Sequence, residues 1–349
     1  MSTKTVLLTG ASGFIALHVL NELLKRNYNV IGTVRSQEKG DNIKAQFKKE
    51  YPNAQLSFSI VEEISAPGAF NKVFQEHPEI EEVIHTASPF SFGLNKDFKD
   101  AYFIPATEGT RNVLEAIQSY GKNVKNVVVT SSFATVVNVN KVGDKTFIHT
   151  EKTWNPITWD HVDNEFKAYM ASKKYAEKLA RNFVDEQKPS WTLTTVHPPL
   201  VLGPQKFESS LANTTLNTSA ETINKLLASD PSDTHFFDKP IGTTADVRDV
   251  ALLHVLPLEN ENASGKRLIT IQAKYNGQKI LNIINGNFPE LNGKIAKGSP
   301  DGADEHAEEN SIYYDISKTL EWTGIKSWTT LEETVKDSVR QILDYRSRH

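Results

Sequence analysis

A glycine-containing turn joins an apolar segment to an amphipathic segment at the start of the chain. Residues 6–8 read Val-Leu-Leu, and the octapeptide Thr-Gly-Ala-Ser-Gly-Phe-Ile-Ala follows at 9–16. From 17 to 25 the apolar side chains recur at helical spacing. A strand, a tight turn and a helix in this order form the arrangement that holds the pyrophosphate of a dinucleotide.

Each position of this turn has a physical reason. Gly10 allows a tight turn out of the strand, and Gly13 lets the backbone approach the phosphates. The small Ala16 lets the helix pack close to the sheet, and the helix N-terminus directs its unpaired N–H groups at the anion. Phe14 and Ile15 open this helix and are predicted to border the cofactor. A turn that serves packing alone is the alternative.

Apolar runs of strand length alternate with helix-like stretches along the first two thirds of the chain. We predict helices at 107–119 and 166–187, and strands at 5–9, 29–34, 56–61, 82–86, 125–131, 192–197 and 267–271. This alternation predicts an α/β fold, a Rossmann-type doubly wound parallel sheet with helices on both faces. We expect the dinucleotide-binding domain to span 1–198, with a returning strand near 267–271.

The pattern changes after residue 198. Residues 203–240 are polar and weakly periodic, and residues 286–311 are loop-like, with many glycines, prolines and acidic residues. A last amphipathic helix is predicted at 331–345. We therefore expect residues 199–349 to form a smaller substrate-binding lobe over the carboxyl ends of the strands, where open parallel sheets bind ligands.

The composition excludes several classes of function. The 349-residue chain has a net charge of −4 and a pI of about 6.2, so it lacks the basic surface of a nucleic-acid-binding protein. It contains no cysteine, which excludes disulfides and thiolate metal sites, and no metal site is predicted. We expect no leader peptide, because no charged-then-apolar stretch precedes the first strand, and no apolar run approaches the roughly 18 residues of a membrane span. We expect a cytoplasmic monomer or homodimer with neither nucleic-acid nor membrane partners.

A tyrosine and a lysine four residues apart are the second feature, after the glycine turn, that indicates a function. Tyr169 and Lys173 would share one helix face, one turn apart. Tyrosine exchanges protons near neutral pH only if its pKa falls by three units, which takes about 4 kcal/mol. An ammonium roughly 4–5 Å away supplies about 3–4 kcal/mol at an effective dielectric near 20. Thr130-Ser131-Ser132 ends an apolar strand, so a hydroxyl there can reach a carbonyl oxygen in the ligand crevice.

With these motifs the chain resembles the extended short-chain dehydrogenase/reductases, and within them the yeast ketoreductases that act on methylglyoxal and isovaleraldehyde. The resemblance rests on the glycine turn and on further segments between residues 9 and 251. These read His-Thr-Ala-Ser-Pro-Phe (85–90), Thr-Ser-Ser (130–132), Trp-Asn-Pro (154–156), Tyr-Met-Ala-Ser-Lys (169–173), Gly-Pro-Gln (203–205), Asn-Thr-Ser (217–219) and Asp-Val-Arg-Asp-Val-Ala (246–251).

The resemblance implies a role for each motif. Tyr169 would be the general acid that protonates the carbonyl oxygen, Lys173 would lower its pKa and hold the nicotinamide ribose, and Ser132 would orient the carbonyl. Further residues would line the cofactor: Thr86, Ala87, Ser88, Thr130, Pro198, Leu200 and Ser219.

Two positions depart from the family pattern, and a third position is expected to have a structural role. Glu63, followed by Ile64, stands where relatives often carry Asp beside the adenine, and Leu200 replaces an aromatic residue of some relatives. Asn112 occupies a position where the family often has a structural asparagine, for which support of a helix and a loop is the expected role.

The segment after the second strand favours NADP(H) over NAD(H). An NAD site carries an acidic residue there for the ribose 2′-hydroxyl, whereas this chain has Arg35 and, one helical turn further, Lys39. Arginine binds a 2′-phosphate bidentately, and cations are otherwise disfavoured near a helix N-terminus. Glu38 argues against this assignment, because an acidic residue near this position favours NAD(H). The alternative interpretation of Arg35 and Lys39 is a solvated basic patch.

We predict an NADPH-dependent carbonyl reductase that acts on aldehydes and ketones, including keto esters. Phe90, Phe92, Phe133 and Leu200 would form an apolar lining for a small-molecule carbonyl substrate, although each ring could instead belong to the core. A nucleotide-sugar epimerase or dehydratase of the same fold is one alternative. A non-catalytic NADP-binding regulator is the other.

Overall fold

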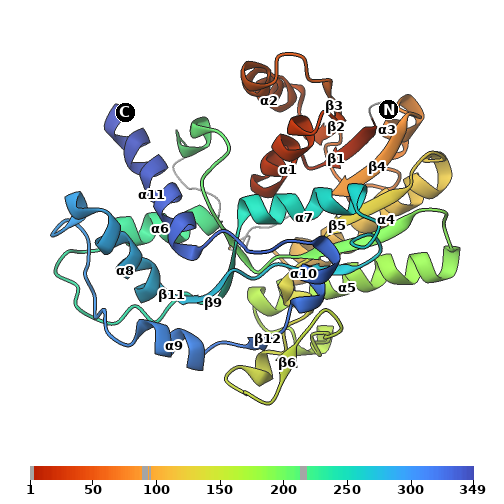
Figure 1. Cartoon of the computed structure of the whole chain (residues 1–349). Coiled ribbons are helices and arrows are strands. Elements are labelled where there is room, and N and C mark those ends of the chain that lie inside the picture. Colours follow the sequence, from red (N-terminus) through yellow and green to blue (C-terminus); the bar gives the residue numbers. More distant parts are fainter. Residues whose placement is uncertain (1–3, 89–92, 94–95, 213–217) are drawn as a thin grey trace.

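The computed structural model describes residues 4–88, 93, 96–212 and 218–349 (Figure 1). Phe90 and Phe92 lie outside the described residues, as do the side chains of Thr218 and Ser219. Within the described ranges, no helix is both long enough and apolar enough to cross a membrane.

Seven parallel strands form the main sheet and confirm the predicted fold class. Their spatial order is β10-β7-β5-β4-β1-β2-β3, and every neighbouring pair is parallel. The order reverses between β1 and β4, which opens the ligand crevice of a doubly wound sheet. The strands are β1 (Thr5–Thr9), β2 (Asn29–Val34), β3 (Leu56–Ile60), β4 (Ile80–His85), β5 (Asn126–Thr130), β7 (Thr192–His197) and β10 (Arg267–Ile269).

Helices cover both faces of this sheet, whose central strands are buried on both sides. In β1, Val6 and Leu8 pack into one apolar cluster and Leu7 packs into the other. The first cluster lies under α1 (Phe14–Lys25), α2 (Gln37–Glu50) and α7 (Val247–Glu259). The second lies under α3 (Asn71–Glu76), α4 (Ile104–Tyr120) and α5 (Glu165–Gln187).

A smaller lobe has its own sheet and its own core. The sheet order is β11-β9-β8, with β9 parallel to β8 and antiparallel to β11. Figure 1 shows the helices of this lobe gathered at one side of the molecule, away from β1 to β3. Its elements are β8 (Leu200–Leu202), α6 (Thr218–Leu227), β9 (Ile241–Asp246), β11 (Ala273–Asn276), α8 (Gly277–Asn287) and α11 (Leu331–Arg348).

The structure corrects two expectations for the C-terminal part. The segment expected to be loop-like, 286–311, contains α9 (Ala303–Glu309), and the weakly periodic segment 203–240 contains α6. Only the two alanines of α9 at positions 303 and 307 are buried, which leaves almost no apolar periodicity in its sequence. The remaining elements are α10 (Ser317–Thr323) and the parallel pair β6 (Ile148–His149) and β12 (Tyr313–Tyr314).

Candidate active site

The turn between β1 and α1 requires glycine at its first position. Gly10 has a φ of +65°, and a Cβ atom there would lie 2.8 Å from the Cα atom of Ala87. Gly13 is the N-cap of α1, provides no capping side chain, and precedes a first turn without acidic residues. The first N–H groups of α1 and the positive end of its dipole are therefore suited to an anion. This geometry fits the pyrophosphate of a dinucleotide.

The end of β4 is fastened to this turn. The Thr86 hydroxyl donates to the carbonyl oxygen of Thr9 at 2.5 Å, and the Ala87 N–H donates to the Thr9 hydroxyl at 3.2 Å. The Thr9 hydroxyl also lies 2.8 Å from Nδ1 of the buried His85. These contacts hold the two strand ends together at the place where the strand order reverses.

Three consecutive residues at the end of β5 contact one face of α5. Lys173 Nζ donates to the carbonyl oxygen of Thr130 at 2.9 Å, and the Tyr169 hydroxyl donates to Ser132 Oγ at 3.2 Å. Ser132 Oγ also accepts the N–H of Ala134 at 3.1 Å, as the cap of a short 3₁₀ turn. The structure therefore brings Ser132, Tyr169 and Lys173 together.

Burial shifts the pKa values of the two titratable side chains. It raises the pKa of the Tyr169 hydroxyl above its ordinary value, although the bond to Ser132 acts in the opposite direction. Burial of Tyr169 therefore opposes the lowering of its pKa that the resemblance implies for Lys173. Burial also lowers the pKa of Lys173 to about 8, against the opposing charge of Glu177.

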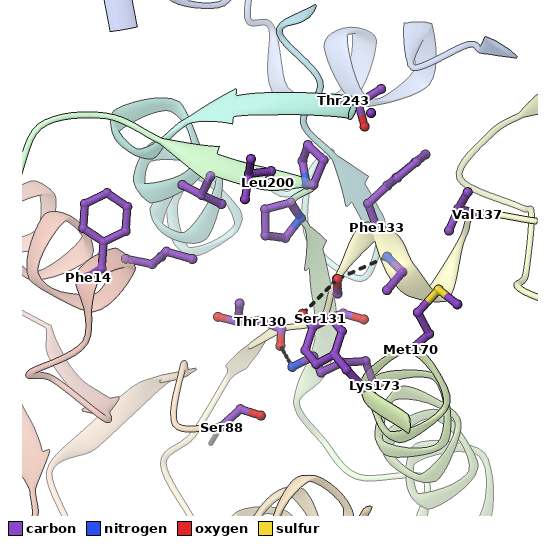
Figure 2. A pocket seen from close by; sticks show the side chains of 18 of the residues that line it. Phe14, Ser88, Thr130, Ser131, Phe133, Val137, Met170, Lys173, Leu200 and Thr243 are labelled. Atoms are coloured by element: carbon purple, nitrogen blue, oxygen red, sulfur yellow. Dashed lines mark hydrogen bonds between the residues drawn. The ribbon is translucent and has the colours of Figure 1, made fainter. Parts of the chain in front are cut away.

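A cavity of about 660 Å³ runs from the start of α1 to the lobe. In Figure 2, Phe14 stands at one end and Val137 and Met170 stand toward the other, with Thr130 and Lys173 between them. Twelve of the predicted site residues line it: Gly13, Phe14, Ile15, Thr86, Ser88, Thr130, Ser132, Phe133, Tyr169, Lys173, Pro198 and Leu200.

Several lining residues were not predicted from the sequence. Phe166 and Met170 flank Tyr169 on α5, so helical spacing could have revealed them. Ile241, Thr243 and Tyr275 come from β9 and β11 of the lobe, for which the sequence had no strand prediction. Phe133 lines the cavity but is only 5% exposed, and it packs into an apolar cluster of the core.

The residues predicted near the adenine lie outside this cavity lining. Arg35 and Lys39 are exposed at the start of α2, where the Ser36 side chain accepts the N–H of Lys39. Glu63 accepts the N–H and the hydroxyl of Ser65 at 3.0 and 2.7 Å. These two bonds, followed by the charge of Arg35, lower the pKa of Glu63 below its ordinary value despite partial burial.

Asn112 supports the adjacent loop. Its side-chain amide donates to the carbonyl oxygens of Ile64 and Ala66, each at 2.9 Å. Asn112 is thus a buried structural residue, in the role that the sequence predicted for it. Ser219 lies at the start of α6, and its side chain is outside the description.

The comparisons with known proteins agree with this geometry. The family model for the NAD dependent epimerase/dehydratase family matches residues 6–271. The NADPH-dependent methylglyoxal reductase GRE2 of Saccharomyces cerevisiae is 38% identical over 349 residues, with 99% of each chain covered. The crystal structure of yeast methylglyoxal/isovaleraldehyde reductase Gre2 complexed with NADPH has a TM-score of 0.91 and 38% identity, covering 99% of this chain and 100% of that one. The crystal structure of Gre2 from Candida albicans in complex with NADPH has a TM-score of 0.91 and 41% sequence identity, and the match covers 98% of this chain and 99% of that one. The chain belongs to the NAD dependent epimerase/dehydratase family, the extended short-chain dehydrogenase/reductases.

Proposed function

We propose that the chain is an NADPH-dependent carbonyl reductase that converts aldehydes and ketones, including keto esters, to alcohols. The observation that carries this proposal is the single cavity that joins the N-terminus of α1 to Ser132, Tyr169 and Lys173. The printed names of the relatives, NADPH-dependent methylglyoxal reductase and methylglyoxal/isovaleraldehyde reductase, support the same activity.

NADP(H) is the cofactor, and its reduced nicotinamide supplies the hydride when it is bound. The glycine turn and the start of α1 would hold the pyrophosphate, because a Cβ atom at position 10 would collide with Ala87 and the α1 N–H groups have no capping side chain. Arg35 and Lys39 would hold the 2′-phosphate. Ile64, which Asn112 supports through its carbonyl oxygen, would lie beside the adenine, with Glu63 next to it.

The side chains at the end of β5 and on α5 would carry the proton chemistry. The Ser132 hydroxyl orients the substrate carbonyl, and the Tyr169 hydroxyl gives its proton to the carbonyl oxygen. The raised pKa of Tyr169 keeps this hydroxyl protonated before reaction, as a general acid requires. Burial lowers the pKa of Lys173 to about 8, so this side chain keeps most of its charge at neutral pH, and a positive charge one helical turn from Tyr169 would stabilise the tyrosinate that forms during the reaction.

The remaining walls of the cavity favour an apolar substrate. Phe133, Val137, Phe166, Met170 and Tyr275 are among the residues that line it. Among the described lining residues, Lys173 is the one charged side chain. A cavity of this kind suits branched or aromatic carbonyl compounds, and it discriminates among them by only about 1–3 kcal/mol per methylene.

The family description also favours a second candidate, a nucleotide-sugar epimerase or dehydratase. Such an enzyme must neutralise a substrate diphosphate with cations, and the described walls of the lobe around the cavity contribute none. The lining therefore supports the reductase over this alternative. A regulator that only binds NADP would have no use for the proton donor Tyr169.

One assay separates these candidates. The absorbance of NADPH is followed with methylglyoxal, isovaleraldehyde, a β-keto ester and a nucleotide sugar, and the same panel is repeated with NADH. We expect carbonyl-dependent oxidation of NADPH, slower oxidation of NADH, and no turnover of the nucleotide sugar. Conversion of the nucleotide sugar without net cofactor oxidation would replace the reductase by an epimerase, and cofactor binding without any turnover would replace it by a regulator.

Two further properties stay predictions. The chain is expected to act as a monomer or homodimer, which light scattering tests directly. It is expected in the cytoplasm, which fractionation of cells that carry a tagged copy tests.

A further inference from the structure

The end of β5 is attached to α5 at a third point besides Lys173 and Tyr169. The Ser131 hydroxyl donates to Glu177 Oε2 at 2.8 Å, and both residues are buried. Glu177 follows Lys173 by one helical turn on the same face of α5. Residues 130, 131 and 132 therefore bind positions 173, 177 and 169 of one helix. This arrangement fixes the strand end, including the serine hydroxyl that Tyr169 contacts.

Glu177 has two charged partners, one on β10 and one on its own helix α5. Its Oε1 accepts hydrogen bonds from Nε of Arg267 on β10 at 2.8 Å and from Nε of Arg181 on α5 at 3.0 Å. The Thr135 hydroxyl lies 2.8 Å from Oε2, so both carboxylate oxygens have partners. Burial opposes a charge here, but His197 and the two guanidinium groups hold the pKa of Glu177 well below its ordinary value.

A buried ion pair of this kind is weak evidence of a contribution to stability, because desolvation offsets most of the attraction. The position of the Glu177 carboxylate matters for Lys173 as well as for the strand end. The carboxylate lies one helical turn from Lys173, and its negative charge raises the pKa of that lysine against the effect of burial. The same group thus holds the strand end in place and compensates the buried ammonium.

The other titratable groups around this site are uncharged or act on Glu177. Burial lowers the pKa of His85, at the end of β4, to about 3, and that of His254, on α7, to about 4. His197 on β7 is neutral for the same reason, with a pKa near 3. The two arginines are paired with Glu177 itself. His197 Nε2 lies 3.5 Å from Glu177 Oε1, so this imidazole also faces the carboxylate that acts on Lys173.

We propose that Glu177 is a positioning residue for the reaction: through Ser131 it holds the strand end that carries Ser132, and it places a carboxylate one helical turn from Lys173 on the same face of α5. This inference rests on the proposed function. It assigns Glu177 no contact with substrate or cofactor.

Two variants separate the two parts of the proposal. Ser131→Ala removes the hydrogen bond to Glu177 and keeps the charge. We expect kcat per active site to fall about tenfold, since small displacements of reacting groups have effects of this size, with the pH profile unmoved. Glu177→Gln keeps the shape and removes the charge. The basic limb of kcat/KM should move to lower pH by at least about half a unit, because Lys173 then loses its proton more easily.

A matched control distinguishes positioning from stability. Thr334 on α11 also donates a hydroxyl to a buried carboxylate, Asp246, at 2.7 Å, and that carboxylate also pairs with an arginine, Arg248. Thr334→Val should lower the melting temperature about as much as Ser131→Ala does, and leave kcat unchanged. The dissociation constant of NADPH, measured by fluorescence from pH 6 to about 10, gives a readout that needs no turnover. In Glu177→Gln, NADPH binding should weaken at a lower pH than in the wild type.

The outcomes are distinguishable. If Ser131→Ala and Glu177→Gln change only the melting temperature, as Thr334→Val does, Glu177 is purely structural and the inference is overturned. If Glu177→Gln does not fold, the kcat of Ser131→Ala decides alone. If the wild type binds NADPH but reduces no carbonyl compound, the proposed function fails, while the pH dependence of NADPH binding still tests the link between Glu177 and Lys173.

Discussion

Phe133 and Phe166 line the same cavity but should respond very differently to truncation. Phe133 is 5% exposed and packs among Ile269, Ile271 and Ile312, whereas the Phe166 side chain on α5 is 57% exposed. Phe133→Ala removes a buried ring and leaves a void, which costs about 3–5 kcal/mol of unfolding free energy. Phe166→Ala removes a ring that already faces solvent, and should change stability by less than about 0.5 kcal/mol.

The pair is tested by a thermal melt and a chiral analysis of the alcohol product. For a chain of this size we expect Phe133→Ala to lower the melting temperature by roughly 5–10 °C. Phe166→Ala should leave the melt unchanged, admit bulkier ketones and change the enantiomeric ratio. Equal losses of stability in the two variants would contradict the reasoning. So would an unchanged melt of Phe133→Ala, because the ring would then be lining rather than core.

Three further predictions concern the cofactor and the proton chemistry. Arg35→Ala should raise the Michaelis constant for NADPH far more than that for NADH, and equal increases would show that Arg35 touches only the adenosine part that both cofactors share. The value of kcat/KM should fall as the pH rises through about 8, because Lys173 loses its charge there; a pH–rate profile flat to pH 10 would contradict this. Gly10→Ala must place a Cβ atom 2.8 Å from Ala87 at a φ of +65°, so it should weaken NADPH binding in a titration and destabilise the fold by more than about 1 kcal/mol.

The large sheet could be predicted because most of its strands, the edge strand β3 excepted, are buried on both faces. Runs such as 127–130 and 192–196 consist of apolar or β-branched residues, and turn or helix signals follow them. The glycine turn was equally predictable from the sequence, because its first position tolerates no side chain. The returning strand β10 was found for the same reason, although it ends two residues earlier than expected.

The lobe was harder to predict because its elements are short and polar. Strand β9 reads Ile-Gly-Thr-Thr-Ala-Asp, and it is buried only through pairing with β8 and β11, which lie far from it in the sequence. Helix α9 buries only two alanines. Such elements are stabilised by tertiary contacts that no local pattern encodes.

The candidate site was predictable in its chemistry but not in its surroundings. The spacing of Tyr169 and Lys173 was enough to predict the pair, whereas the burial that raises the pKa of Tyr169 depends on packing from several elements. The signal for Glu177 was present as an acidic residue one turn beyond Lys173. Its partners Ser131 and Arg267 come from distant strands, so only the structure identifies the cluster.

The central claim, that Tyr169 donates the proton in a carbonyl reductase, is tested most directly by comparing Tyr169→Phe with Tyr175→Phe. Both tyrosines lie on α5, and Tyr175 contacts Phe103 through its ring, away from the cavity lining. We predict that Tyr169→Phe lowers kcat by about 10²–10⁴-fold with NADPH binding preserved, and that Tyr175→Phe keeps the kcat of the wild type. A Tyr169→Phe enzyme that retains more than about a tenth of the wild-type kcat would contradict the account.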